Sequence, residues 1–425
     1  MSRLIQRLRN KKWSIYDRQV WILFAGTIIN TVGGTMVMPF MSIYMYTQMD
    51  VSMTMVGLAF FIGTVMGAVA SCVGGMVCDR FGRKSIFIAG LTMQVAALLL
   101  ISVAIDAKVS YWPMVAVLAI GQIIDGLYRP VPDIMIADVV EPGRRIGAYG
   151  LIRVGGNIGA VIGPVLGGAL ALVAMSYSSM FYIAALTTLV FLLVVIYWLR
   201  DTKPSDTCNT VRLKEIARIA GDRPFLLVCL IIMLLIIPYS QMYALMSVYC
   251  NAYLGMNTLE VGGIFAVSGI MVAIFQFPIT MLIGRYRMTS MLALASLVFA
   301  LGFGLVAVSA TLAMMYLCMV IITIAEMIWV PSDSTLKANL APADRRGQYF
   351  GFAGLVSATG YAIGPLFGGV LKDTLNSNVP FMWVAIGAIF LVSMAGFLLL
   401  TRMIPAATNN DRRTGGRSGL AAGNA

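Results

Sequence analysis

Histidine is absent from this chain of 425 residues, and only 11% of its residues are charged. Since about a quarter of the residues in a typical soluble domain are charged, the composition excludes an ordinary soluble fold. Because no imidazole is available, any side chain that exchanges protons near neutral pH must be a carboxylate. The sequence also has no metal-ligand cluster, nucleotide-binding loop or soluble domain, which argues against an enzyme or a receptor.

Cysteine is scarce as well. The six cysteines lie mostly within apolar runs and show no paired spacing: Cys72, Cys78, Cys208, Cys229, Cys250 and Cys318. We expect small core residues and no disulfide framework. The basic N-terminal arm precedes an apolar run too long for a signal-peptide core, so we expect the arm to be retained.

Long apolar runs dominate the sequence, which is 60% hydrophobic with a mean hydropathy of +0.88. Each run is close to the length, about 20 residues, that crosses a bilayer as a helix. We predict an all-α integral membrane protein with twelve spans, at 20–45, 54–77, 84–105, 111–138, 146–173, 179–199, 224–250, 259–283, 289–309, 311–336, 348–372 and 379–401.

The basic residues lie mostly on one side of these predicted spans. Of the 30 Lys and Arg residues, only Lys108 and Lys372 fall in loops or span ends on the other side, and only Arg129 and Arg153 lie inside spans. We expect the protein to lie in the plasma or inner membrane. The positive-inside rule then places both of its termini in the cytoplasm. The net charge of +12 therefore needs no nucleic-acid partner.

The chain contains an internal repeat. Residues 142–149 (PGRRIGAY) match 342–349 (PADRRGQY), and GAVIGPVLGG at 159–168 matches GYAIGPLFGG at 360–369. We predict six-helix bundles over 1–199 and 223–404, a central cytoplasmic loop over 200–222 and a disordered cytoplasmic tail over 405–425. Repeats of the same topology place a substrate site between the halves near the membrane midplane.

The loop after the second span reads GGMVCDRFGRKS, at 74–85. Taken alone, it is a glycine turn with basic residues that anchor the cytoplasmic face. Its spacing resembles the motif G-x-L-A-D-R-x-G-R-K of the major facilitator superfamily, which implies two six-helix bundles and a charge latch for the outward-open state. The residues assigned to this latch are Gly75, Asp79, Arg80, Gly82, Arg83 and Lys84, and we count Asp138 with them.

The fifth predicted span carries the pattern G-x-x-x-G-P-x-x-G-G. Its residues are Gly159, Gly163, Pro164, Gly167 and Gly168. Glycines at this spacing let helix backbones approach closely, and the proline permits a bend, so a packing seam is one reading. The pattern also resembles the helix-5 signature of drug/proton antiporters in the superfamily, although the eleventh span repeats it.

Three ionisable residues interrupt the fourth span. Asp125, Arg129 and Asp133 are four positions apart, so a helix would place them on one face. They could form a self-neutralising ladder that only holds the helix in place. Because one arginine cannot neutralise two acids, we expect one acid to be available for function or to pair with Arg153, which has Asn157 a turn later.

Glu326 in the tenth span has no basic residue within four positions, whereas Asp333 has Lys337 at i+4. Removal from water favours the neutral form of a carboxyl group, so Glu326 is predicted to load and release protons. The alternative is a protonated Glu326 bonded to a nearby carbonyl. The superfamily's usual helix-4 motif R-x-x-Q-G is absent. An acid-bearing helix 4 with a helix-10 glutamate resembles the subgroup of the lactococcal multidrug transporter.

The candidate cavity residues are polar, aromatic or methionine side chains on several spans: Asn30, Met36, Met38, Tyr44, Tyr128, Asn157, Tyr239, Gln241, Tyr243 and Trp329. Together with the resemblance they favour a proton-coupled exporter of lipophilic, cationic compounds that works by alternating access, without a cofactor and as a monomer. The alternative is a transporter of one polar metabolite, which the few Asn and Gln in the spans disfavour.

Overall fold

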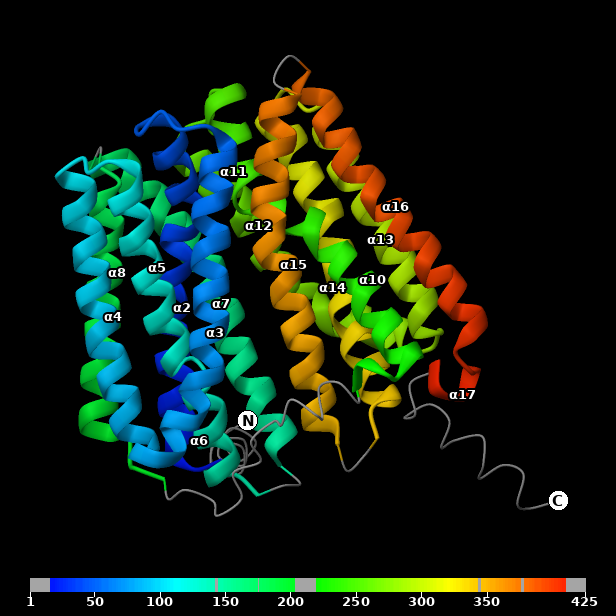
Figure 1. The fold of residues 1–425 in the computed structure, drawn as a ribbon, viewed down its shortest axis with the longest axis horizontal. Helices are drawn as coiled ribbons and strands as arrows, with labels where there is room; N and C mark the ends of the chain where they lie inside the picture. Colours follow the sequence, from blue (N-terminus) through cyan, green and yellow to red (C-terminus); the bar gives the residue numbers. More distant parts are fainter. Residues whose placement is uncertain are drawn as a thin grey trace, which may run out of the picture. The chain divides into compact units, whose positions relative to one another are not determined.

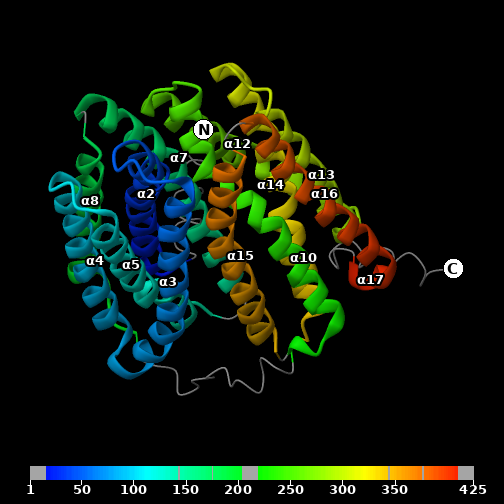
Figure 2. The same cartoon turned by 45° about the horizontal axis from the view of Figure 1, so that its top comes forward.

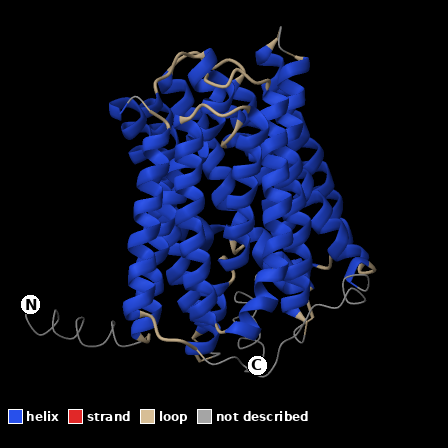
Figure 3. Cartoon of the chain, turned by 60° about the vertical axis from the view of Figure 1, so that its left-hand side comes forward, coloured by secondary structure: helices blue, strands red, loops and turns tan. Residues whose placement is uncertain are grey.

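A computed structural model describes residues 16–141, 144–174, 176–202, 219–342, 345–375 and 378–409. This part of the chain consists of helices and connecting loops, without strands (Figure 3). Twelve of its helical segments are long and apolar enough to cross a membrane, and they coincide with the twelve predicted spans. The predicted all-α membrane fold is therefore confirmed. The N-terminal arm, most of the central loop and residues 410–425 lie outside the described residues.

The structure divides into two compact units, and long apolar helices make up both (Figure 1). The first unit holds α2 up to Phe40, α3 from Met66, and α4 to α8. The bounds of its helices are α2 Arg18–Thr47, α3 Met53–Phe81, α4 Arg83–Asp106, α5 Tyr111–Tyr128, α6 Val131–Val139, α7 Arg145–Ala174 and α8 Ser178–Trp198.

The second unit holds Met41–Val65, from the C-terminal part of α2 and the N-terminal part of α3, together with all helices from α10 onward. The bounds of those helices are α10 Arg223–Tyr239, η1 Ser240–Met242, α11 Leu245–Val248, η2 Tyr249–Tyr253, α12 Thr258–Ile283, α13 Met288–Val306, α14 Leu312–Leu340, α15 Arg346–Thr374, α16 Val379–Met403 and α17 Ala406–Asn409. The short α17 extends the helical part into the predicted tail, because the buried Asn409 accepts a hydrogen bond from the Thr289 N–H at 3.0 Å.

The same neighbour relations recur inside each unit, as the sequence repeat requires. In the first unit α4 packs against α5 and α8, and in the second α13 packs against α14 and α16 (Figures 1 and 2). The core of the first unit includes Phe87, Tyr128 and Phe191. In the second unit Phe299 stacks on Phe390, with ring centroids 5.0 Å apart.

The seventh span is the most irregular in the described part. Helix α10 contains Pro238 and ends at Tyr239, and a 3₁₀ turn, the short α11 and a π-helical turn follow it. Proline lacks the N–H that a helix needs, so a change of helical hydrogen bonding is expected next to it. Interrupted spans of this kind occur where transporters bind substrates.

Candidate functional site

Glu326 is half-buried on α14 and faces tyrosines of its own unit. The Tyr239 hydroxyl of α10 lies within hydrogen-bonding reach of the Glu326 carboxylate, which also acts electrostatically on Tyr243 and Tyr361. The Tyr239 ring packs edge-on against Trp329, with centroids 5.0 Å apart, and lies 6.4 Å from the Tyr361 ring. The structure thus places one carboxylate beside an aromatic cluster.

Two rings of this cluster are accessible. Tyr243 is 37% exposed and Tyr361 is 40% exposed, whereas Tyr239 and Trp329 are buried. Tyr243 follows the break in the seventh span and stacks on Phe265, with centroids 5.5 Å apart and the ring planes at 11°. Tyr361 was not among the predicted residues. The sequence repeat aligns Tyr361 of α15 with Ala160 of α7. This replacement of a small residue by a tyrosine is the sequence signal that could have indicated Tyr361.

Asp333 and Lys337 form the predicted i+4 pair on α14. Lys337 Nζ donates to Asp333 Oδ2 at 2.7 Å, and both side chains are at least 85% shielded from solvent. The second oxygen, Oδ1 of Asp333, is buried without a hydrogen bond among the described residues. The charge of Asp333 is therefore mainly balanced by Lys337, and Glu326 is the carboxylate of α14 within hydrogen-bonding reach of Tyr239.

The first unit has its own charged cluster at the end of α5. Arg129 Nε donates to Asp125 Oδ2 at 2.9 Å, and Arg129 is 71% exposed. The Tyr128 hydroxyl is within hydrogen-bonding reach of Asp125 and Asn30. Because the Tyr128 ring is 4% exposed and packs in the core against Phe87, it supports the acid and does not line an open surface.

The predicted ladder from Asp125 to Asp133 forms only in part. Helix α5 ends at Tyr128, and α6 begins at Val131, after Arg129 and Pro130. In the described part Arg129 pairs with Asp125, while the Asp133 side chain is exposed. Arg153, the base expected to take the second acid, is exposed on α7 and has no ion pair in the described part. The prolines remove two backbone donors, which explains the break.

The glycines of α7 form a close seam with α2 inside the first unit. A side chain at Gly163 would lie 2.7 Å from the Val32 carbonyl oxygen, and one at Gly159 would lie 2.6 Å from Thr31 Cβ. Gly167 faces Met36 and Phe40. Helix α7 runs through Pro164 to Ala174, and Gly168 lies within it. The glycines of α7 therefore allow close packing of this helix against α2.

The matching glycines of α15 pack on α10 in the same way. A side chain at Gly364 would lie 2.9 Å from the Ile237 carbonyl oxygen. Gln241 Nε2 donates to the Gly364 carbonyl oxygen at 2.6 Å, and Gln241 is fully buried against Gly368. Gln241 therefore joins two helices and is not exposed to a cavity in this conformation.

The described residues of the predicted latch form a polar network in the first unit, with Arg83 and Asp138 as its shielded part. Arg83 Nε lies 3.4 Å from Asp138 Oδ2, and these side chains are 2% and 11% exposed. Thr202 Oγ1 donates to the same oxygen of Asp138 at 2.9 Å. Gly82 has φ of 88°, a conformation that favours glycine, so it separates α3 from α4. The Lys84 N–H donates to Asp201 at 3.1 Å.

The other predicted residues are dispersed. The surroundings of Gly75 and the side chains of Asp79 and Arg80 are not part of what the structure describes. Thr202 and Asp201, which follow α8, were not predicted, because nothing in the sequence links them to the loop after the second span. Of the remaining cavity candidates, Met36 and Tyr44 are buried, Met38 is 43% exposed and Asn157 is half-buried.

Comparison with known proteins identifies the class. The chain matches the Major Facilitator Superfamily over residues 23–365 and again over 273–423. It belongs to this family and is a multi-pass membrane transporter. The multidrug resistance protein MdtH of Yersinia enterocolitica is 25% identical over 382 residues, which are 88% of this chain and 92% of that protein.

Two further similarities bear on fold and function. A Na⁺, Li⁺, K⁺/H⁺ antiporter of Planococcus maritimus is 23% identical over 389 residues, covering 84% of this chain and 90% of that protein. The crystal structure of a mutant of the nucleoside transporter NupG superposes with a TM-score of 0.76 at 14% identity, over 90% of this chain and all of that one. The last similarity concerns the fold alone.

Proposed function

We propose that this transporter is a proton-coupled antiporter that exports lipophilic cations by alternating access, as a drug/proton antiporter of the superfamily. The observation that carries the proposal is the Glu326 carboxylate beside the cluster of Tyr239, Tyr243, Tyr361 and Trp329. Aromatic faces attract organic cations, and a carboxylate adds charge complementarity. The names of the multidrug and H⁺-antiporter relatives support this choice.

The proposed mechanism is competition between two cations for one carboxylate. When Glu326 is protonated, it is neutral, and the site loses the negative charge that adds to the attraction of the aromatic rings for a cationic substrate. When the proton leaves, the negative carboxylate and the rings bind the substrate. Since the proton and the cationic substrate compete for the same carboxylate, binding of one releases the other, which is the condition for coupled exchange.

Asp125 has a supporting role in this scheme. Its carboxylate accepts a hydrogen bond from Arg129 Nε at 2.9 Å, so its charge already has a partner on the same helix end. Together with Tyr128 and Asn30 it would form a polar region in the first unit. The proposal therefore ranks Glu326 before Asp125, Asp133 and Asp333 as the group that carries the transported proton.

The Glu326→Gln variant tests the proposal. Glutamine keeps the size and hydrogen-bonding capacity of the side chain but cannot change charge, so we expect ethidium efflux to fall to the background rate while the protein still reaches the membrane. Glu141→Gln is the matched control, because Glu141 is 80% exposed and its nearest charged partner, Arg144, is 4.0 Å away. Normal efflux by Glu326→Gln would remove the basis of the proposal.

A further inference from the structure

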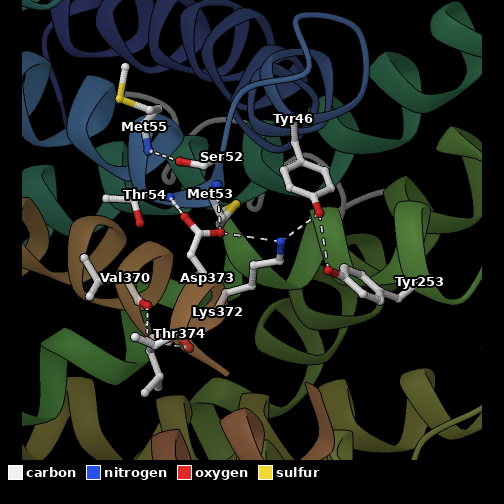
Figure 4. Close-up of polar contacts among 11 residues, drawn as sticks. Tyr46, Ser52, Met53, Thr54, Met55, Tyr253, Val370, Lys372, Asp373 and Thr374 are labelled. Atoms are coloured by element: carbon white, nitrogen blue, oxygen red, sulfur yellow. Dashed lines mark hydrogen bonds and ion pairs between the residues drawn. The ribbon is translucent and has the colours of Figure 1, made fainter. Parts of the chain in front are cut away.

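Lys372 is a buried lysine near the end of α15. It is 6% exposed, and its ammonium donates to the Tyr46 hydroxyl at 2.8 Å. The Tyr46 hydroxyl lies 3.3 Å from the Tyr253 hydroxyl, and the Lys372 nitrogen lies 4.6 Å from the centre of the Tyr46 ring (Figure 4). Tyr46 is on α2 and Tyr253 ends the π-helical turn, so one ammonium connects three segments of the second unit.

Asp373, the residue after Lys372, connects α15 to a fourth segment, the start of α3. Its Oδ2 accepts the Thr54 N–H at 2.7 Å and its Oδ1 accepts the Met53 N–H at 3.2 Å (Figure 4). Met53 is the first residue of α3, and the first N–H groups of a helix have no partner within it. A carboxylate at this end is favoured by hydrogen bonding and by the helix dipole. Lys372 lies 3.5 Å from the same carboxylate.

The backbones approach closely where these side chains meet. A side chain at Gly369 would lie 2.8 Å from Thr54 Cα, and one at Gly57 would lie 2.6 Å from Leu366 Cα. Glycine at both positions permits this contact between the start of α3 and the end of α15. The Lys372 and Asp373 side chains therefore complete a fitted contact and do not merely lie near each other.

The loop held by this contact has room beside it. A hollow of about 700 Å³ is lined by Tyr46, Thr47, Asp50, Val51, Ser52, Ala252, Lys372 and Asp373. In the same loop Asp50 has φ of 51°, which a residue with a side chain adopts at an energetic cost. The loop thus lies at the edge of an open space.

We propose that Lys372 and Asp373 form a clasp, together with Tyr46 and the first N–H groups of α3, that opens and closes during the transport cycle. The inference rests on the alternating access of the proposed function. Apolar packing would make a permanent joint without the cost of burying charges. A charged clasp can open at low cost, because water replaces its hydrogen bonds. By the predicted topology it lies on the non-cytoplasmic side.

Hydrogen exchange of the amides in residues 51–56 tests the clasp, because Asp373 holds two of them. The full-length protein in nanodiscs is compared with Lys372→Met and with Tyr46→Phe, a milder change that removes one hydroxyl. Loss of a charge-assisted hydrogen bond should raise exchange at 51–56 about tenfold in Lys372→Met and less in Tyr46→Phe. The control is Lys108→Met, which removes the other basic residue predicted on this side.

A clasp that opens should produce a second measurable change, which a permanently closed contact would not produce. If opening at 51–56 belongs to alternating access, peptides containing Arg83 and Asp138 should exchange more slowly in the same variants. Unchanged exchange at 51–56, or faster exchange there without slower exchange at Arg83 and Asp138, would overturn the clasp. Ethidium efflux is measured in parallel. If the wild type shows no efflux but the exchange pattern appears, the proposed substrate fails and the clasp stands.

Discussion

At the scale of single residues, the carboxylates illustrate what local sequence can predict. The Asp333–Lys337 pair follows from i+4 spacing on a helix, and the structure confirms it at 2.7 Å. The aromatic surroundings of Glu326 could not be read in the same way. Tyr239 comes from α10, Tyr243 from the residues after η1 and Tyr361 from α15, and only packing of these separate segments brings the tyrosines to α14.

The accessible ring of Tyr243 gives a prediction at this scale. If the aromatic cluster binds lipophilic cations, Tyr243→Leu should weaken ethidium binding between about twofold and thirtyfold, the range expected for one cation–π contact. Tyr243→Phe should retain most of the affinity, because it keeps the ring. Binding is measured by ethidium fluorescence with purified protein.

A matched control separates a binding role from a general effect of losing an exposed aromatic ring. Tyr197 on α8 is 74% exposed and stacks edge-on against Trp198, with centroids 6.1 Å apart. Tyr197→Leu should leave ethidium affinity unchanged. Equal affinity in Tyr243→Leu and the wild type would exclude Tyr243 from the binding surface.

At the scale of helices, the repeat extends to the register of packing. Val32 and Thr35 of α2 face Gly163, and Ile237 of α10 and Ser240 of η1 face Gly364. The sequence repeat indicates the glycine pattern of α7 and α15, but it does not reveal these partners. They are identifiable only when the first helix of each unit is placed against the fifth.

The seam predicts a specific effect of added volume. Gly163→Ala would place a methyl group 2.7 Å from the Val32 carbonyl oxygen, and a backbone atom cannot move aside as a side chain can. We expect a loss of about 1–3 kcal/mol in stability, which is the usual cost of overpacking, and a lower melting temperature in detergent. Gly156→Ala on the same helix is the control, since no other group lies within 4 Å of the added atom. Equal melting temperatures for the two variants would show that the seam tolerates the methyl group.

At the scale of the whole molecule, hydropathy and charge were sufficient for the twelve spans. Each span must be apolar over about 20 residues, and this leaves a signal in any window of that length. The division into compact units was harder to predict from the sequence, because Met41–Val65 belongs to the second unit. That grouping depends on contacts such as those of Asp373 with Met53 and Thr54, more than 300 positions away. No local pattern marks such a contact.

Transport by the complete protein decides among the substrate classes. In proteoliposomes with an imposed pH gradient, we expect ethidium to accumulate against its gradient on the acidic side, and dissipation of the pH gradient by nigericin to stop it. Other lipophilic cations should compete, because a carboxylate with aromatic rings recognises charge and apolar surface but few specific polar groups. Glu326→Gln proteoliposomes and protein-free liposomes are the controls.

Saturable uptake of one sugar or amino acid, or exchange of Na⁺ or K⁺ for protons without any effect of ethidium, would assign the site to a different substrate. The relation to the Na⁺, Li⁺, K⁺/H⁺ antiporter makes the inorganic cations a necessary part of this test.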